Sequence, residues 1–250
     1  MTGNVREKQS IREFVWERLD KAGVLNSGRV YDRIPDFKRS VSAAILVCEL
    51  DVWKQASVVK SNPDKAQRPL RQYALEGGKI VYMAVPRLRE EQCFVALENS
   101  LGASAETLST IEGAMKYGRL VSPEEMRSVD LVISGSVAVN REGIRIGKGG
   151  GFADLEYAMA VSVGVVNNET PVLTTVHDLQ ILDEPFPSTR HDVSMDYIVT
   201  ENETINCNRR IPRPNGIYWE DLEASKIQEI PLLMRLSGEL NNKKGDRPAS

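Results

Sequence analysis

The sequence has little cysteine and histidine, with three Cys and two His among 250 residues. The thiols are odd in number, widely spaced and form no Cys-x-x-Cys pair, which argues against a disulfide framework and is typical of a reducing compartment. Without an HExxH motif or a Cys/His cluster, the pattern also argues against a zinc centre. Any bound metal should therefore be an oxygen-ligated ion such as Mg²⁺.

Long apolar runs and an excess of basic charge are missing too. The longest apolar runs, such as 43–48, fall far short of the roughly 20 residues that span a bilayer, and residues 1–20 are charged throughout, unlike a signal peptide. We therefore expect a cytoplasmic protein without a membrane partner. Because 32 Lys and Arg face 35 Asp and Glu, for a net charge of -3, we also expect no nucleic-acid partner, which would call for a basic face. The oligomeric state is not indicated.

What is present is an alternation of helical and extended segments. Apolar residues at helical spacing, together with turn signals, predict helices over Arg6 to Lys21, Val41 to Val52, Pro69 to Leu75 and Asp154 to Ser162. Apolar runs predict strands over Ser57 to Val59, Lys79 to Val85, Cys93 to Leu97, Leu131 to Ser134, Val172 to Val176 and Tyr197 to Val199.

Such strands between helices predict a mostly parallel sheet that is covered on both faces. We therefore expect an α/β protein: one three-layer α/β/α domain over residues 1–240. The stretch 241–250 has no apolar pattern, and we predict a disordered tail there.

The most informative segment runs from Gly143 to Asp154. Glycines at 147, 149, 150 and 151 lie before an amphipathic helical pattern. Because glycine has no Cβ, backbone N–H groups there can approach an anion at a helix N-terminus, and Arg145 and Lys148 add positive charge. The segment is neither a Walker A loop nor a GxGxxG motif, since Gly149 follows Lys148 and Phe152 takes the last glycine position. A solvated glycine turn is the alternative, but the flanking charges favour a triphosphate with Mg²⁺.

On these residues the chain resembles the 5-formyltetrahydrofolate cyclo-ligases, or methenyltetrahydrofolate synthetases, and most of all their divergent branch of synthetase-domain-containing proteins. Family members carry Arg-x-Gly-x-Gly-x-Gly-Tyr-Tyr-Asp after Pro-Gly-x-x-Phe-Asp. Here residues 145–154 read Arg-Ile-Gly-Lys-Gly-Gly-Gly-Phe-Ala-Asp, after Ser-Gly-Ser-Val-Ala-Val-Asn at 134–140. The resemblance extends from about Lys8 to Thr200, and it implies a Rossmann-like fold with ATP and Mg²⁺ as cofactors.

Lys8 and Arg12 are one helical turn apart, on the same face as Ile11 and Val15. A like-charged pair at this spacing costs a few tenths of a kcal/mol in an isolated helix, so a ligand could offset the cost. The alternative is that both stems pack on the core while their heads reach water. In the family a Lys and Arg at this spacing contact ATP phosphates, and the resemblance implies the same here.

The resemblance assigns the remaining site residues. It implies catalytic roles for Arg145 and Lys148. It implies ATP binding by Lys8, Arg12, Gly147, Gly149, Gly150, Gly151, Phe152 and Asp154. It implies substrate binding by Asp64, Pro86 and Arg87, and Mg²⁺ binding by Asp154 and Asp192. Asp64 also reads as an ordinary residue of a helix N-terminal turn, Arg87 as an exposed loop arginine, and surface carboxylates such as Asp192 as merely solvated.

The family activity is an ATP-dependent ring closure of 5-formyltetrahydrofolate to the 5,10-methenyl form, with release of ADP and phosphate. Phosphoryl transfer relies on positioning and charge neutralisation, which agrees with cations and glycines in place of a nucleophilic triad. The Tyr-Tyr of the family loop is Phe152-Ala153 here, so the substrate could be another formylated pterin or heterocycle. The alternative is a non-catalytic ATP-binding regulatory or interaction protein of the same fold.

Overall fold

The computed structural model describes residues 7–26, 28, 30–207 and 211–245 of the chain. Its helices are α1 Lys8–Lys21, α2 Ser40–Cys48, α3 Asp51–Gln55, α4 Arg68–Glu76, α5 Ala105–Leu108, α6 Ile111–Tyr117, α7 Phe152–Ser162, α8 Ala224–Glu229 and α9 Pro231–Gly245. Its strands are β1 Val58–Ser61, β2 Ile80–Ala84, β3 Phe94–Leu97, β4 Arg119–Val121, β5 Leu131–Ile133, β6 Ala138–Val139, β7 Arg145–Ile146, β8 Val172–Thr175, β9 Tyr197–Val199 and β10 Thr204–Asn206.

Eight strands form one mixed sheet in the order β10-β9-β8-β5-β1-β2-β3-β4. The five strands from β9 to β2 are parallel to their neighbours, whereas β10, β3 and β4 add antiparallel edges. The short strands β6 and β7 pair as a separate antiparallel hairpin. The prediction of an α/β protein with a mostly parallel sheet is confirmed, and each expected strand lies within two residues of its predicted ends.

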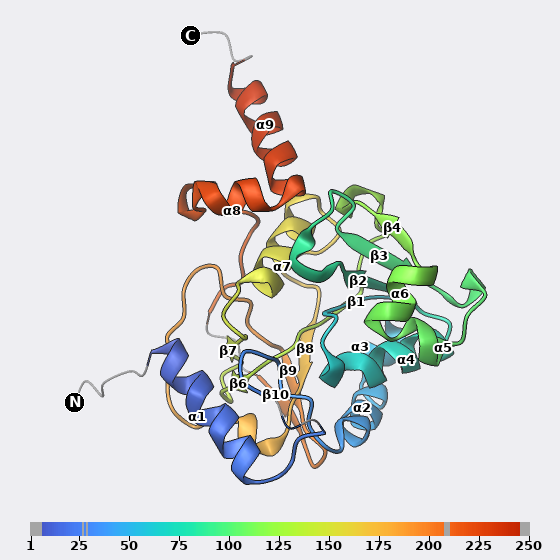
Figure 1. Ribbon diagram of the computed structural model, residues 1–250, viewed down its shortest axis with the longest axis vertical. Coiled ribbons are helices and arrows are strands. Elements are labelled where there is room, and N and C mark those ends of the chain that lie inside the picture. Colours follow the sequence, from blue (N-terminus) through green and yellow to red (C-terminus); the bar gives the residue numbers. More distant parts are fainter. Residues whose placement is uncertain (1–6, 27, 29, 208–210, 246–250) are drawn as a thin grey trace.

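Successive residues of a strand point to opposite faces of a sheet. The central strands here are buried on both faces, and helices cover each face. Val58 packs in a core with α7 and the start of α9, while the next residue, Val59, packs in a second core with α2 to α6. The sheet is the middle of three layers, with α7 and α9 on one side and α2 to α6 on the other (Figure 1).

A third core joins the N-terminal helix to the β6–β7 hairpin. Ile11, Val15 and Leu19 of α1 are fully buried in a cluster that also holds Ala138 and Ile146 of the hairpin. The apolar stripe of α1 therefore fixes the helix beside the segment that leads into the glycine loop. Arg12 of α1 thereby reaches Gly147, which is 135 residues away in sequence.

Two sequence predictions need correction. The single helix expected over Val41 to Val52 is two helices, because Leu50 has extended backbone (φ -70°, ψ 141°) and Asp51 begins α3, where a carboxylate is favourable in the first turn. The expected tail is helical up to Gly245, since α9 continues through residues 241–245, as propagation costs little once a helix has formed. Residues 246–250 lie outside the described residues, and the domain limit at 240 stays a prediction.

Within the described part of the chain, no helix is long and apolar enough to cross a membrane. In Figure 1, the end of α9 extends upward, away from the three layers, whereas α1 lies at the lower left.

Candidate functional site

The candidate site lies where two parallel neighbours, β1 and β5, send the chain in opposite directions. After β1 the chain passes through 62–64 to α4, which packs on one face of the sheet. After β5 it passes through the β6–β7 hairpin and the glycine loop, residues 147–151, to α7 on the other face. In open α/β sheets such a divergence leaves a crevice at the carboxyl ends of the strands. A cleft of about 740 Å³ is found there.

The glycine loop forms one wall of this cleft. Gly149 and Gly151 have φ angles of +111° and +67°, a region that side chains rarely adopt, and Gly151 is the N-cap of α7. A Cβ on Gly149 would lie 3.6 Å from the guanidinium carbon of Arg12, and one on Gly147 would lie 2.8 Å from Nη1 of Arg145. The missing Cβ of Gly147 therefore lets Arg145 approach the loop backbone. At Gly149 the positive φ is what favours glycine, because a Cβ there would be at ordinary contact distance from Arg12.

Four of the cations that line the cleft belong to α1 and to the segment around the glycine loop, and each is held by a protein acceptor. Nε of Arg12 donates to the carbonyl of Gly147 at 2.6 Å. Lys8 contacts both carboxylate oxygens of Asp192 at 2.6 Å, and Lys148 lies 3.3 Å from Oδ1 of Asp64. Arg145, with a side chain that is 2% exposed, donates to the carbonyl of Gly135 and to Asp154. Lys8 and Arg12 thus both line the cleft.

Two further observations describe the electrostatics of this wall. Burial lowers the pKa of Arg12, and the neighbouring Arg145 lowers it further against the opposing effect of Asp192. Nε of Arg145 is fully enclosed and has no hydrogen-bond partner. Cations held this close to one another repel each other, and a bound anionic ligand would offset that repulsion.

Asp154 and Asp192, the predicted Mg²⁺ ligands, both line the cleft. Asp154 pairs with Arg145 and accepts a bond from the Val193 N–H at 3.1 Å, while Asp192 pairs with Lys8 and accepts from Thr189 N–H at 2.7 Å. Among the residues that the structure describes, no group of three or more His, Cys, Asp or Glu side chains could hold a metal ion. The donors fit a Mg²⁺ ion that takes one or two carboxylates and completes its shell with phosphate oxygens and water.

The predicted substrate residues come from the loops after β1 and β2. Asp64, Pro86 and Arg87 all line the cleft. Arg87 is exposed, and it and Leu88 have left-handed backbone, with φ of 60° and 53°. Because non-glycine residues in this region cost free energy and are concentrated at ligand sites, the strained turn supports a functional reading of Arg87. The geometry does not test what it binds, so that part stays a prediction.

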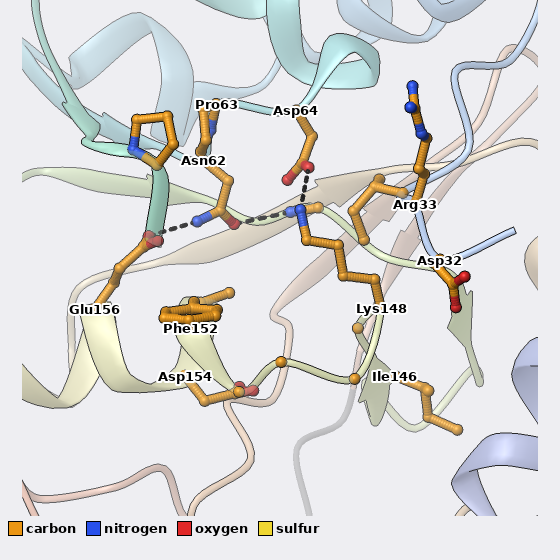
Figure 2. A pocket seen from close by; sticks show the side chains of 18 of the residues that line it. Asp32, Arg33, Asn62, Pro63, Asp64, Ile146, Lys148, Phe152, Asp154 and Glu156 are labelled. Atoms are coloured by element: carbon orange, nitrogen blue, oxygen red, sulfur yellow. Dashed lines mark hydrogen bonds and ion pairs between the residues drawn. The ribbon is translucent and has the colours of Figure 1, made fainter. Parts of the chain in front are cut away.

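A buried cluster on the cleft floor was missed by the sequence reasoning. Nζ of Lys60 lies 2.5 Å from Oε2 of Glu156, and Nδ2 of Asn62 donates to the same oxygen at 2.6 Å. Burial raises the pKa of Glu156, while the Lys60 ammonium opposes the rise. Figure 2 shows Glu156 and Asn62 pointing toward each other beside Phe152 and Asp64. The available signals were a lysine inside an apolar strand and a glutamate two residues after Asp154.

Two polar residues outside the cleft, Asp196 and Gln180, have structural partners. Asp196 pairs with the buried Arg213 and accepts from the Val172 N–H, and the buried Gln180 donates to the carbonyl of Ser136 at 2.8 Å. Neither of these two lines the cleft.

A three-layer α/β fold with a cleft at its switch point, walled by a glycine loop and four cations, defines the chain as an α/β protein suited to an anionic ligand such as a polyphosphate. The comparison with family models is more specific. The chain belongs to the 5-formyltetrahydrofolate cyclo-ligase family, whose model matches residues 4–201. Helices α8 and α9 lie beyond the matched region.

Curated relatives and a solved structure agree with this assignment. The chain is 38% identical over 234 residues to the methenyltetrahydrofolate synthase domain-containing protein of Danio rerio and 39% identical over 234 residues to that of Homo sapiens. Each match covers 92% of this chain and 61% of the relative, so the chain spans about three fifths of these proteins. The NMR structure of Aquifex aeolicus 5,10-methenyltetrahydrofolate synthetase shares the fold, with a TM-score of 0.51 at 19% identity, over 86% of this chain and 99% of that chain.

Proposed function

We propose that the protein is an ATP- and Mg²⁺-dependent cyclo-ligase that converts 5-formyltetrahydrofolate, or a related formylated pterin or heterocycle, to a ring-closed product with release of ADP and phosphate. The observation that carries the proposal is the meeting of Lys8, Arg12, Arg145 and Lys148 at a glycine loop that opens a helix. They come from two segments of the chain that are far apart in sequence, and the chain belongs to a family named for this reaction.

The cations have distinct tasks in this proposal. Arg12 and Lys8, on the rigid helix α1, bind the outer phosphates, and the N–H groups of the glycine loop bind the phosphates nearer α7. Arg145 and Lys148 contact the transferred phosphoryl group, where fixed positive charge stabilises the transition state. Mg²⁺, when bound with the nucleotide, neutralises phosphate charge, and Asp154 and Asp192 orient it. Nucleotide binding then competes with protein ion pairs, because Lys8 and Arg145 are partnered with these two carboxylates.

The second substrate occupies the side of the cleft formed by Asp64, Pro86 and Arg87. Phe152 and Ala153 leave this side without the two phenol hydroxyls of the family loop, so selectivity for the folate should differ while ATP affinity is retained. Replacing both with Tyr should raise turnover of 5-formyltetrahydrofolate at unchanged ATP affinity. The Phe152 ring already lies 3.8 Å from Nζ of Lys226, a contact that a tyrosine ring can keep.

The missing hydroxyls also favour a second candidate, a non-catalytic ATP-binding regulatory or interaction protein. It predicts nucleotide binding without ADP release. Both candidates bind ATP at the glycine loop. They differ in whether the opposite wall of the cleft binds a second substrate that is then converted.

The test measures ADP release and methenyl absorbance together, with Mg·ATP and 5-formyltetrahydrofolate. ATP-dependent product formation in wild type, lost in Arg145→Ala and retained in Arg141→Ala, supports the cyclo-ligase. Arg141 is the matched control because it pairs with Glu203 outside the cleft. ATP binding without ADP release for folate, pterin or thiamin-type formyl compounds, before and after the Tyr replacements, would favour the non-catalytic protein. Failure to bind ATP would exclude both.

A further inference from the structure

The floor of the cleft contains a charged cluster that packing alone does not explain. Lys60 and Glu156 are 1% and 6% exposed in their side chains, and Asn62 is 2% exposed. Replacing a buried ion pair by apolar residues of similar volume is often neutral or stabilising. A buried pair at the floor of a ligand cleft is therefore better explained by binding than by stability.

The hydrogen bonds of the cluster leave one group unused. Oε2 of Glu156 accepts from both Lys60 and Asn62. Asn62 is otherwise satisfied, because its Oδ1 accepts from the Gly135 N–H at 3.0 Å and its carbonyl accepts from Arg71 at 2.6 Å. No described residue donates to Oε1 of Glu156, and this oxygen is not among the fully enclosed unpaired atoms. Since Glu156 lines the cleft, Oε1 is an open hydrogen-bond acceptor at its floor.

The charge around Glu156 indicates what this acceptor would bind. Asp64 is the neighbouring acidic group whose charge acts on Glu156, and Lys60 and Lys148 are the cations that oppose it. The two carboxylates make this side of the cleft unfavourable for phosphate. Phosphate is better bound at the cation-lined wall formed by α1 and the glycine loop. An acceptor between apolar and aromatic surfaces such as Phe152 instead suits an N–H or amino group of a flat heterocycle.

We propose that Oε1 of Glu156 accepts a hydrogen bond from a ring N–H or amino group of the second substrate, and that Lys60 and Asn62 are positioning residues that hold the carboxylate for this contact. The inference rests on the proposed function, because it names the chemistry by which the same cleft recognises its amino-heterocycle. A substrate that presents only hydrogen-bond acceptors at this position is rejected, because neither it nor Oε1 then has a proton to donate.

Glu156→Gln replaces the hydrogen-bond acceptor at this position by a donor and keeps the size of the side chain. Lys60 and Asn62 both donate, so the amide oxygen takes the place of Oε2 and the NH₂ group takes that of Oε1. The substrate donor then meets another donor. The affinity for 5-formyltetrahydrofolate, which carries a 2-amino-4-oxopteridine ring, should fall about 10- to 100-fold in calorimetry, as expected for losing a hydrogen bond to a charged group. The affinity for Mg·ATP should stay within about twofold. Glu112→Gln, at an exposed position of α6, is the matched control.

The role of Lys60 and Asn62 is tested by which ligand their variants affect. Lys60→Met should weaken heterocycle binding and leave the affinity for Mg·ATP within about twofold, because Lys60 holds the carboxylate that faces the heterocycle. Lys60→Arg, which keeps the positive charge, should retain more of the heterocycle affinity than Lys60→Met. A purely structural Lys60 would change the affinities for both ligands alike or for neither. Glu156→Asp, which keeps a carboxylate for Lys60, provides a second variant should the amide variant not fold, and is expected to bind the heterocycle more weakly than wild type.

The outcomes separate this inference from the proposed function. Equal heterocycle affinity in wild type and in the Glu156 variants would overturn the inference while leaving turnover intact. Heterocycle binding that depends on Glu156, without any ATP-dependent turnover, would support the inference and refute the cyclo-ligase. Absence of heterocycle binding in wild type would overturn both.

Discussion

Arg145 connects the two halves of the site at the residue scale. It begins β7, is almost fully buried, and bonds both to the loop after β5 through Gly135 and to α7 through Asp154. Its Nε is fully enclosed and has no hydrogen-bond partner. An arginine held in this way has lost its side-chain freedom before a ligand arrives, so binding a phosphate to it costs little further entropy.

Arg145→Ala should therefore weaken Mg·ATP binding more than Lys148→Ala. Lys148 is 46% exposed in its side chain and holds Asp64 at 3.3 Å, so it contributes a screened charge, whereas Arg145 contributes a buried, fixed one. We expect a loss of about 10- to 100-fold for Arg145→Ala, from hydrogen bonds to a charged group, and a smaller loss for Lys148→Ala. Calorimetric titration measures both, with Lys116→Ala on α6 as the lysine control. Unchanged affinity in both variants would remove the glycine loop as the nucleotide site.

The cations and glycines of this wall could be predicted from the sequence, because their spacing in a short segment carries the signal. Lys60 and Glu156 could not. They are 96 residues apart. Lys60 is the one charge of β1, Glu156 lies in the mostly apolar α7, and their contact depends on how α7 packs over β1. Pairing between distant elements leaves no periodicity along the chain.

Lys60→Met should destabilise the protein by about 3–5 kcal/mol at neutral pH, because it leaves a buried carboxylate without its cation. Burial raises the folded-state pKa of Glu156 above its unfolded value of about 4.3. Stability from such a group is fully present below the unfolded pKa and is lost as the pH rises through the folded pKa. Without Lys60 this loss grows, so the deficit should be largest near pH 8 and shrink toward pH 5. Urea denaturation at both pH values checks this.

The double variant Lys60→Met/Glu156→Gln is the control for that experiment. With no ionisable group at the site, its stability relative to wild type should lack the growing deficit toward pH 8 that Lys60→Met shows. A deficit for Lys60→Met that is the same at pH 5 and pH 8 would contradict the interpretation.

At the scale of elements, α7 and the C-terminal helices form one unit. Lys226 of α8 lies over the ring of Phe152, the first residue of α7, and Ile230, Leu232 and Leu233 are fully buried in the core that contains α7. The segment beyond the region that matches the family model therefore packs on the helix whose N-terminus forms the glycine wall.

Leu232→Ala should cost about 2–5 kcal/mol, the usual range for removing a buried leucine side chain. Met234, two residues on and 49% exposed, is the matched control on the same helix, and its replacement by Ala should change stability by less than about 0.5 kcal/mol. Chemical denaturation measures both. Equal effects of the two substitutions would show that α9 does not dock on the α7 core in solution.

The longer helices and strands could be predicted from the sequence, because their apolar residues follow a clear pattern. Their exact ends could not be predicted. The helix expected from Asp154 begins at Phe152, since Gly151 at φ +67° makes the turn that starts it. The hairpin strands β6 and β7 are two residues each, too short for any period to appear. Helices α8 and α9 follow from tertiary packing against α7, which local patterns do not record.

At the scale of the whole molecule, the cleft requires the complete fold. Its walls come from α1, from the loops after β1 and β2, and from the glycine loop with α7. The central parallel strands hold these loops at one edge of the sheet, while the third core holds α1 beside them. Such a site does not survive unfolding, so a ligand that binds there binds the native state alone.

Mg·ATP should therefore raise the melting temperature of the whole chain in proportion to the logarithm of its concentration. At about 100 times the dissociation constant the native state gains about 2.7 kcal/mol, and at about 2–4 °C per kcal/mol for a chain of this size the melting temperature rises by about 5–10 °C. Scanning calorimetry over a nucleotide series measures the shift.

The same calorimetric series, run with and without Mg²⁺, separates the contribution of the metal to binding from that of the nucleotide. Asp154 and Asp192 both line the cleft, so ATP without Mg²⁺ brings its full negative charge close to two carboxylates. We therefore expect a smaller shift of the melting temperature than with Mg·ATP. Asp154→Asn should narrow that difference, while Arg145→Ala should reduce the shift with either form. Equal shifts with and without Mg²⁺ in wild type would remove both carboxylates from metal binding. A melting temperature that stays constant while calorimetric titration detects nucleotide would place the nucleotide at a site that does not distinguish the folded from the unfolded chain, and hence outside this cleft.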